Sequence, residues 1–357
     1  MAVTPDNPIG LDGFEFVEFT SPDPKKMAHL LEQLGFVAAH THPSKPATRY
    51  KQGDISLVVN QSETGQAADF RAAHGPSANG MAFRVDDAEA AFELATSRGA
   101  KAAEPGEGLL GEGSYVLQGI GGSLLYLVDR FGDRGDLYAD WTPVPGAAEA
   151  EARENVGLKV LDHLTHNVRR GQMRTWSSFY NQVFGFEEQK YFDIKGKQTA
   201  LFSQAMIAPD KAIRIPLNES QDEHSQIEEF IREYNGEGIQ HLALTTDDIY
   251  ATIERLRERG VALQDTIETY YELVDQRVPG HGEDLERMRN NRILIDGNEE
   301  EGLLLQIFTE NLFGPIFFEV IQRKGNAGFG NGNFQALFES IELDQMRRGV
   351  LPATEPA

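Results

Sequence analysis

The feature that most restricts how this chain of 357 residues can fold is an internal repeat. Residues 79–101, NGMAFRVDDAEAAFELATSRGAK, match residues 240–262, QHLALTTDDIYATIERLRERGVA, and the Asp-Asp and Arg-Gly pairs have the same spacing in both. Each copy is typical of a strand, an aspartate that caps a helix, and a glycine that ends the helix. Residues 124–132, LLYLVDRFG, match residues 317–325, FFEVIQRKG, in the same order. The sequence therefore predicts two copies of one strand-rich unit.

The beginning of each copy and the segment between the copies indicate two domains. LDG at 11–13 corresponds to LDH at 161–163, and an amphipathic segment follows each of them. PGAAEAEAREN at 145–155 is small and acidic, which is typical of a linker. We therefore expect domains at residues 1–147 and 156–357. Because strands outnumber helices in a βαβββ order, the expected fold is α+β, with paired modules that form curled mixed sheets.

The two copies differ most where the second carries residues that bind metals. Three such residues stand opposite residues that are not metal ligands in the first copy: His163 opposite Gly13, His241 opposite Gly80, and Glu319 opposite Tyr126. Unrelated core residues would not be expected to change together in this way. The comparison predicts a metal site in the second domain and none in the first.

Glu319 interrupts the apolar stretch GPIFFEVIQRKG at 314–325, which is typical of a buried strand. On a strand, Phe317, Glu319 and Ile321 share one face. A buried carboxylate is costly unless it is paired, hydrogen-bonded or bound to a metal. We expect no buried arginine or lysine partner close to it in the sequence, so a metal ion is the partner that fits.

Two histidines and a carboxylate on three different strands are the ligands of a facial triad, which leaves three coordination positions open and favours Fe(II) in oxygen-activating enzymes. The chain has no cysteine, so nitrogen and oxygen must hold any metal. A lone histidine in a strand is more often structural than a ligand. His166 lies three residues after His163, so it should face the opposite side and not be a co-ligand.

The amino-acid composition limits which classes of partner the chain can be expected to bind. A net charge of -23 argues against a nucleic-acid or anionic-membrane surface and favours a small-molecule partner. The chain has no apolar run of about 18 residues, and its N-terminus has no basic region followed by an apolar core, so we expect neither membrane spanning nor export. The lack of cysteine suits a cytoplasmic protein.

Several motifs together closely resemble the 4-hydroxyphenylpyruvate dioxygenase family of the vicinal oxygen chelate superfamily. They are LDHLTHNV (161–168), PLNE (216–219), GEGIQHLAL (236–244), LLLQIFTEN (303–311), FFEVIQRKG (317–325) and GFGNGNFQALFESIE (328–342). The resemblance spans almost the whole second half and is weaker in the first. It implies two vicinal-oxygen-chelate domains, the first without metal. From the residues themselves, Asn333 can cap a C-terminal helix with Phe334, Leu337, Phe338 and Ile341 on one face, which is either a docked helix or a lid over the metal site.

The resemblance also implies an activity and a set of site residues. Members convert 4-hydroxyphenylpyruvate and O2 to homogentisate and CO2 in tyrosine and phenylalanine catabolism, with one Fe(II) per subunit, commonly as a homo-oligomer, tetramer or dimer. The metal ligands fall on His163, His241 and Glu319. The polar catalytic positions match Ser203, Asn218, Gln240 and Gln306, and the substrate contacts match Pro216, Gln226, Phe308, Phe329 and Phe334.

Rival functions of three classes stay open at this stage. Hydroxymandelate synthase takes the same substrate and metal but hydroxylates the benzylic carbon, and the residues alone do not separate the two. A glyoxalase-like isomerase or an extradiol ring-cleaving dioxygenase is disfavoured by the LLLQIFTEN stretch and the long aromatic C-terminal segment. A metal-free binding module on the same fold is disfavoured by the complete ligand set in the second half.

Overall fold

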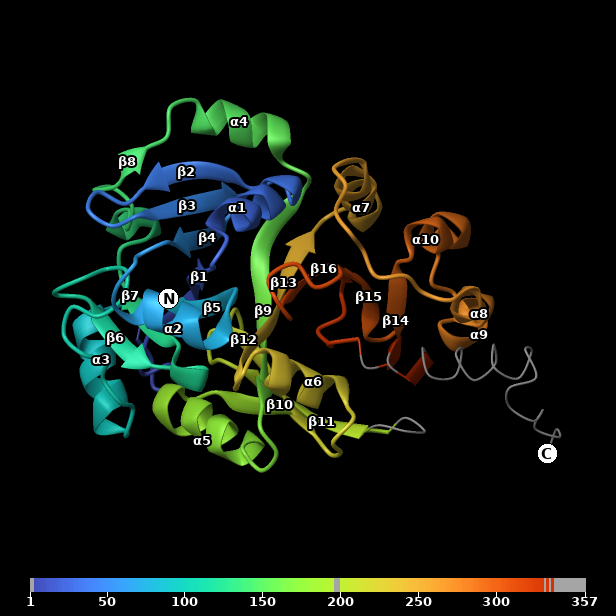
Figure 1. The fold of residues 1–357 in the computed structure, drawn as a ribbon. Helices are drawn as coiled ribbons and strands as arrows, with labels where there is room; N and C mark the ends of the chain where they lie inside the picture. Colours follow the sequence, from blue (N-terminus) through green and yellow to red (C-terminus); the bar gives the residue numbers. More distant parts are fainter. Residues whose placement is uncertain (1–2, 196–199, 331, 334, 337–357) are drawn as a thin grey trace.

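The structure is a computed structural model and describes residues 3–195, 200–330, 332–333 and 335–336. Its framework is two mixed sheets of eight strands, one in each half of the chain (Figure 1). The N-terminal sheet has the strand order β6-β7-β5-β1-β4-β3-β2-β8. Its strands are β1 (Leu11–Thr20), β2 (Val37–Thr41), β3 (Ala47–Gln52), β4 (Ile55–Asn60), β5 (Ser77–Val85), β6 (Tyr115–Gln118), β7 (Leu124–Val128) and β8 (Thr142–Pro143).

The second sheet has the strand order β10-β11-β12-β9-β13-β16-β15-β14. The pairs β12–β9 and β13–β16 are parallel and the others are antiparallel, as expected for a mixed sheet. Its strands are β9 (Leu158–Val168), β10 (Glu187–Lys195), β11 (Ala200–Ile207), β12 (Arg214–Ser220), β13 (Gly238–Thr246), β14 (Leu294–Asn298), β15 (Gly302–Phe308) and β16 (Phe317–Lys324).

Helices connect the strands and lie on the outside of the sheets (Figure 1). They are α1 (Pro24–Gln33), α2 (Gln66–His74), α3 (Ala88–Ser97), α4 (Ala147–Glu154), α5 (Met173–Phe184), α6 (Gln226–Glu233), α7 (Ile249–Glu258), α8 (Glu268–Glu272), α9 (Val274–Arg277) and α10 (Leu285–Asn291), with short 3-10 helices at Ile120–Gly122 and Gly132–Arg134. Among the described residues, no helix is both long and apolar enough to cross a bilayer.

The order of these elements confirms the predicted α+β fold with paired modules. The series β1-α1-β2-β3-β4 and β9-α5-β10-β11-β12 follow the βαβββ order, and so does β13-α7-β14-β15-β16, into which α8, α9 and α10 are inserted. In the remaining module, β5-α3-β6-β7, an isolated bridge between Ala102 and Leu117 stands where the additional strand would be. The predicted C-terminal lid helix, with Phe334, Leu337, Phe338 and Ile341, lies outside the described residues.

The repeated Asp-Asp and Arg-Gly pairs do what their spacing predicts. The Asp87 carboxylate accepts a hydrogen bond of 2.9 Å from a first-turn amide of α3, and the Asp248 carboxylate accepts one of 3.1 Å from the corresponding amide of α7. Gly99 and Gly260 follow the two helices with φ of +98° and +78°, a region that favours glycine. Both helices therefore begin and end at equivalent points of the repeat.

The strand registers confirm that Tyr126 is the N-terminal counterpart of Glu319. Ala82 on β5 pairs with Tyr126 on β7, and Ala243 on β13 pairs with Glu319 on β16. Ala82 and Ala243 are equivalent in the 79–101 and 240–262 repeat. The match of LLYLVDRFG with FFEVIQRKG is therefore correct in three dimensions as well as in sequence.

The predicted equivalence of His163 and Gly13 is wrong. Ala243 pairs with His163 on β9, whereas its counterpart Ala82 pairs with Phe16 on β1. Phe16, three residues beyond Gly13, therefore occupies the place of the histidine. The match of LDG with LDH is too short to reveal this offset. Phenylalanine is no more a metal ligand than glycine, so the absence of a metal site from the first domain stays a prediction.

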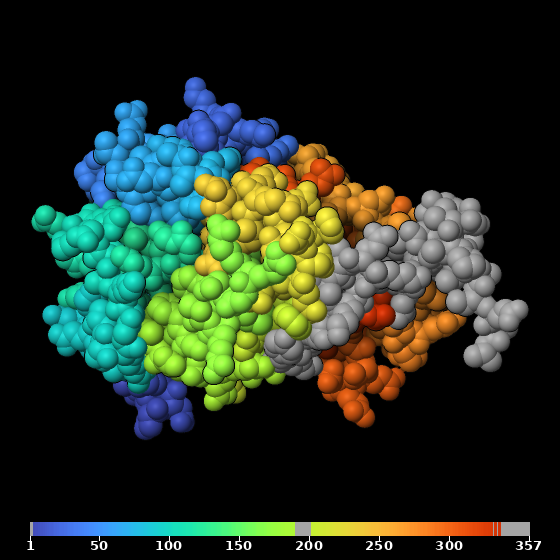
Figure 2. Space-filling view, turned by 60° about the horizontal axis from the view of Figure 1, so that its bottom comes forward, coloured from blue at the N-terminus to red at the C-terminus, as the bar shows by residue number. Residues whose placement is uncertain are grey.

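The segment predicted as a linker forms α4, which connects the two sheets (Figure 1). Its Glu151 carboxylate accepts hydrogen bonds from Lys51 Nζ at 2.8 Å and from the Gly53 amide at 3.1 Å, which fixes the helix on the N-terminal sheet. The two halves also pack directly together (Figure 2). The rings of Phe83 and Phe184, one from each half, lie 5.6 Å apart in an edge-to-face contact.

Candidate metal centre

The three predicted metal ligands come from three adjacent strands of the second sheet. β13 lies between β9 and β16, and its Ala243 pairs with both His163 and Glu319. His241 stands two residues before Ala243, so its side chain projects from the same face of the sheet. All three side chains are buried, with residue exposures of 9% or less. The strand order, rather than closeness in sequence, brings the ligands together.

The donor atoms of the three residues are arranged as a metal site requires. Glu319 Oε2 lies 3.3 Å from His163 Nε2 and 3.5 Å from His241 Nε2. Metal–ligand bonds of about 2.1 Å place donors in neighbouring coordination positions about 3 Å apart, close to these values. One donor atom from each residue lies within 4.8 Å of the others, and no second such group of histidine, aspartate or glutamate side chains occurs among the described residues. The residues therefore fit a single metal ion.

The partner of His163 fixes which of its ring nitrogens can bind a metal. Asp162 Oδ2 lies 2.8 Å from His163 Nδ1. An ionised carboxylate only accepts hydrogen bonds, so Nδ1 carries the proton and Nε2 presents its lone pair towards Glu319. A carboxylate behind a metal-binding imidazole in this way also increases its basicity.

His241 is held in the corresponding way by an amide. Its Nδ1 donates to Gln240 Oε1 at 3.0 Å, which leaves Nε2 free to face the metal position. The hydroxyl of Thr165 lies 3.0 Å from the same Nε2, so it competes with a metal for this lone pair. The ring of Phe317 stacks on the imidazole at 4.7 Å and limits its rotation.

The electrostatics keep the carboxylates ionised. Burial raises the pKa of Glu319, but the adjacent His163 and His241 imidazoles outweigh burial and lower it to about 2. Burial also raises the pKa of Asp162, but hydrogen bonds with Arg323 and His163 outweigh this and hold it well below its usual range. For the imidazoles, burial lowers both pKa values. Burial prevails at His241, whereas the neighbouring Asp162 and Glu319 carboxylates make the net shift at His163 upward.

A cavity of about 310 Å³ opens in front of the three ligands. The described residues that were predicted from the family resemblance all line it: Ser203, Pro216, Asn218, Gln226, Gln240, Gln306, Phe308 and Phe329. Phe334 lies outside the described residues. Apart from the metal ligands, the charged residues that line the cavity are Asp265 and Arg292, which pair with each other at 2.8 Å.

Sequence reasoning missed several residues of this site. Thr165 and Phe317 line the cavity, and each lies two residues from a metal ligand on the same strand. The two-residue period of a strand was therefore enough to find them. Asn333 was expected to cap the lid helix, but it is buried, and its side-chain amide donates to Gln306 Oε1 at 3.2 Å.

The expectation that Glu319 has no buried arginine or lysine partner close to it in sequence is not contradicted, but a half-buried arginine nearby has a role that was missed. Arg323 is four residues further along β16, and its side chain is 16% exposed. Its guanidinium binds Asp162, at 2.7 Å, and thus acts on the site through His163. The signal was available, because residues four apart on a strand share a face.

The prediction for His166 is confirmed. Its ring is fully buried on the opposite side of β9, where Nε2 lies 2.8 Å from the hydroxyl of Tyr180. Burial lowers the pKa of this imidazole to about 3, so it stays neutral. It belongs to the packing between β9 and α5.

Hydrogen-bonded side chains occupy the equivalent place in the N-terminal sheet. The Tyr126 hydroxyl donates to Glu18 Oε2 at 2.7 Å and accepts from the Leu109 amide at 2.8 Å. Asn60 donates to the other oxygen of Glu18 at 2.7 Å. Tyr126 and Glu18 are both fully buried, and the ring of Phe16 packs on Tyr126 at 5.2 Å. These contacts form a hydrogen-bonded polar core at the position that corresponds to the triad.

Comparison with known proteins agrees with this geometry. Residues 5–141 match the family described as hydroxyphenylpyruvate dioxygenase, N-terminal, and residues 160–273 match the glyoxalase/bleomycin resistance protein/dioxygenase superfamily. A 4-hydroxyphenylpyruvate dioxygenase of Pseudomonas aeruginosa is 57% identical over 349 residues, 97% of each chain. A Vibrio vulnificus protein named hemolysin VllY is 55% identical over 349 residues, 97% of this chain and 98% of its own.

A solved structure shows the same architecture. A triple mutant of 4-hydroxymandelate synthase from Streptomyces coelicolor superposes with a TM-score of 0.79 at 28% identity, over 94% of this chain and 99% of its own. The sequence identity between this synthase and the present chain is about half that of the Pseudomonas aeruginosa enzyme. The sequence matches over nearly the whole length, together with the paired modules and the buried triad, show that this chain belongs to the 4-hydroxyphenylpyruvate dioxygenase family.

Proposed function

We propose that this chain is a non-haem Fe(II) dioxygenase that converts 4-hydroxyphenylpyruvate and O2 to homogentisate and CO2. The observation that carries the proposal is the buried triad of His163, His241 and Glu319 at the base of a cavity of about 310 Å³. The 57% identity to the Pseudomonas aeruginosa enzyme supports the same substrate. We assign one Fe(II) to each subunit.

The charges of the site suit an anionic α-keto acid. The triad contributes one negative charge, so with a divalent ion the centre stays positive and attracts a carboxylate. Asp265 and Arg292 neutralise each other at 2.8 Å, so the cavity wall offers no competing free cation among its described residues. The substrate carboxylate should therefore lie at the triad, with the phenol end away from it.

Uncharged groups then orient the rest of the substrate. Ser203 and Asn218 stand directly opposite each other on β11 and β12, so their side chains project from the same face. With Gln226 and Gln306 they can hydrogen-bond a phenol or an oxyanion without competing as metal ligands. We assign Gln240 to the orientation of His241, because its amide oxygen already accepts from Nδ1.

The apolar side of the cavity positions the ring and excludes water. Phe308 and Phe317 meet edge to face at 5.9 Å, and Phe329 lies 5.3 Å from His163. A ferrous ion at the triad supplies chelation of the keto acid and activation of O2. Because the substrate is itself an α-keto acid, the reaction needs no second keto acid: its carboxylate leaves as CO2, and both atoms of O2 end in homogentisate.

We also propose different roles for the two halves of the chain. We assign residues 1–147 to a domain that binds no metal and residues 156–357 to the catalytic domain. Phe16, Gly80 and Tyr126 at the N-terminal ligand positions, with the hydrogen-bonded Glu18 beside them, support a structural role for the first domain. We further propose a cytoplasmic homo-oligomer, a tetramer or a dimer, in accord with the family.

The second candidate function is that of 4-hydroxymandelate synthase. The observation that favours it is the TM-score of 0.79 to such an enzyme, which indicates that the same scaffold supports benzylic hydroxylation. The lower identity of 28%, against 57% for the Pseudomonas aeruginosa dioxygenase, places it second.

The test is anaerobic reconstitution with Fe(II), followed by addition of 4-hydroxyphenylpyruvate and O2, with oxygen uptake and products measured. Homogentisate, with one O2 consumed and one CO2 released per substrate, is the expected result. Hydroxymandelate would select the second function. Bound iron without oxygen uptake would show that the metal site is right and the substrate wrong. A protein that holds two irons per chain would contradict the structural role of the first domain.

A further inference from the structure

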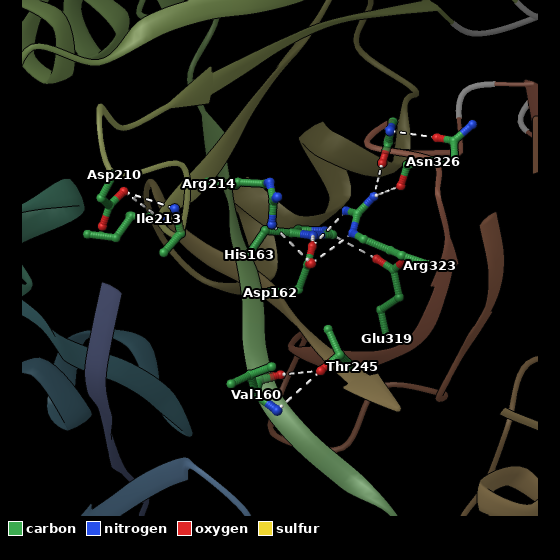
Figure 3. Close-up of polar contacts among 12 residues, drawn as sticks. Val160, Asp162, His163, Asp210, Ile213, Arg214, Thr245, Glu319, Arg323 and Asn326 are labelled. Atoms are coloured by element: carbon green, nitrogen blue, oxygen red, sulfur yellow. Dashed lines mark hydrogen bonds and ion pairs between the residues drawn. The ribbon is translucent and has the colours of Figure 1, made fainter. Parts of the chain in front are cut away.

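Behind the metal ligands, away from the substrate cavity, lies a buried charge cluster that the proposed reaction does not use directly. Its centre is Asp162, which is 5% exposed and touches His163 (Figure 3). Arg323 binds both oxygens of this carboxylate, with Nε 2.8 Å from Oδ1 and Nη2 2.7 Å from Oδ2. Such paired contacts fix the plane of the carboxylate, because the guanidinium is rigid and planar.

Arg214 contacts the same carboxylate from another strand. Its Nη1 lies 3.1 Å from Asp162 Oδ1. Arg214 is on β12 and Arg323 on β16, so cations from both sides of β9 and β13 converge on Asp162. Two cations and the His163 N–H together satisfy a carboxylate that would otherwise be costly to bury.

The remaining guanidinium nitrogen of Arg323, Nη1, contacts the backbone of a neighbouring turn instead of Asp162. Nη1 donates to the carbonyl oxygen of Asn326 at 3.0 Å (Figure 3). It also donates to the carbonyl oxygen of Gly328 at 2.6 Å. These carbonyls belong to the turn that directly precedes Phe329, whose ring lies 5.3 Å from that of His163. One guanidinium therefore holds both the support of a metal ligand and the backbone that places an aromatic wall residue against that ligand.

We propose that Arg323 is a positioning residue that joins the His163 ligand and the 326–329 turn into one rigid unit. Through Asp162 it sets the ring orientation and the protonated nitrogen of His163. Through the two carbonyls it keeps Phe329 at the edge of the same imidazole. Loss of this one side chain should therefore disturb metal binding and the cavity wall together. The inference assumes the metal site of the proposed function but does not depend on its substrate.

Arg214 provides the matched comparison within the cluster. Its guanidinium contacts Asp162 but is not bonded to the 326–329 turn in the described structure. Removal of Arg214 should therefore weaken the support of His163 and leave the turn in place. Arg84 provides a control outside the cluster, because it forms a partly buried ion pair with Glu15 at 2.6 Å in the N-terminal half.

Two measurements that need no turnover test the proposal. The first is the affinity of the metal-free protein for Co(II), titrated anaerobically in place of Fe(II). The second is hydrogen–deuterium exchange of the backbone at 324–330, where the Gly328 amide donates to the Asn326 side chain at 2.6 Å. The variants are Arg323→Lys, which keeps the charge but not the planar fork, Arg214→Lys and Arg84→Lys.

Arg323→Lys is expected to weaken Co(II) binding about 10-fold to 100-fold, the usual effect of losing a group that orients a ligand, and to accelerate exchange at 324–330. Arg214→Lys should weaken Co(II) binding and leave the exchange at the wild-type rate. Arg84→Lys should change neither. Wild-type Co(II) affinity in folded Arg323→Lys would overturn the proposal, as would equal acceleration of exchange in the Arg214 and Arg323 variants.

A variant that leaves the net charge of the cluster unchanged covers the case in which Arg323→Lys does not fold. The double variant Asp162→Asn with Arg323→Gln removes both charges, while the asparagine oxygen can still accept from His163 Nδ1. It should show accelerated exchange at 324–330, and wild-type exchange there would overturn the role assigned to the turn. If the wild-type protein fails to oxidise 4-hydroxyphenylpyruvate, the proposed function falls, whereas both measurements on Arg323 still decide this inference.

Discussion

Replacement of Tyr126 by phenylalanine should destabilise the protein without affecting its metal. The tyrosine hydroxyl donates to Glu18 at 2.7 Å and accepts from the Leu109 amide at 2.8 Å, and the residue is fully buried. Burial and the neighbouring Glu18 raise the pKa of this hydroxyl, so it keeps its proton and remains a donor. The variant removes both hydrogen bonds and changes little else in the packing.

The size of the destabilisation follows from the hydrogen-bonding groups that lose their partner in the variant. A hydrogen bond to a charged group contributes about 1.5–3 kcal/mol, and a buried amide without a partner costs about 1–3 kcal/mol. Glu18 keeps its bond to Asn60 at 2.7 Å, which limits the damage. We therefore expect a loss of about 3 kcal/mol in the free energy of unfolding, or about 6–12 °C in Tm for a cooperative unit of 150–250 residues.

The assay is urea unfolding of metal-free protein, with Co(II) affinity measured in parallel. Tyr115→Phe is the control, because this tyrosine is only partly buried on the edge strand β6, and it should stay within about 0.5 kcal/mol of the wild type. A loss below about 1 kcal/mol in Tyr126→Phe would refute the structural role of the hydroxyl. Unchanged stability with altered Co(II) affinity would instead make the N-terminal site functional.

Three further predictions concern the second half. Glu319→Ala should abolish metal binding, seen as loss of the one bound iron on anaerobic reconstitution, and a fully active variant would refute the assignment. Gln240→Leu removes the acceptor for His241 Nδ1 at 3.0 Å and should weaken Co(II) binding about 10-fold, whereas Gln240→Glu, which keeps an acceptor, should bind more tightly than Gln240→Leu. Burial lowers the pKa of His166 to about 3, so between pH 6.5 and 3 the unfolded chain binds more protons and stability falls as pH falls. At pH 5 this costs about 2 kcal/mol relative to pH 8, and urea midpoints should show a shallower pH dependence in His166→Gln.

The repeat explains why so much of the fold and the metal site was predictable. Helix caps such as Asp87 and Asp248 depend on local hydrogen bonds, so spacing along the chain locates them. The triad could also be predicted from the sequence, because each of its ligands lies on a strand whose counterpart in the other half carries no metal ligand. The comparison needed no knowledge of which strands are neighbours.

The residues that hold the triad in place could not be predicted by comparing the two halves of the sequence. The contact between Asp162 and Arg323 joins residues 161 positions apart. It exists because β13 separates β9 from β16 in the sheet, and the order of strands is a property of topology. Periodicity placed Arg323 on the face of Glu319, but it could not show that the guanidinium reaches past the glutamate to a carboxylate on another strand. The offset between Phe16 and Gly13 was hidden for a similar reason, since register depends on pairing across strands.

The polar core around Tyr126 shows how such a module can be built without the triad. Three side chains that converge on one point must either bind an ion or be replaced by groups that satisfy one another, since buried polar atoms are costly without partners. Gly80 makes this possible in the first half: a Cβ atom there would lie 3.0 Å from both Glu18 Oε2 and Tyr126 Cε2. A histidine introduced at position 80 alone would therefore press on the hydrogen-bonded pair, which would have to shift by a few tenths of an ångström to admit it. A metal site in the first domain would require the removal of Tyr126 and Glu18 together, so the structural and catalytic forms of this module are separated by several coupled substitutions.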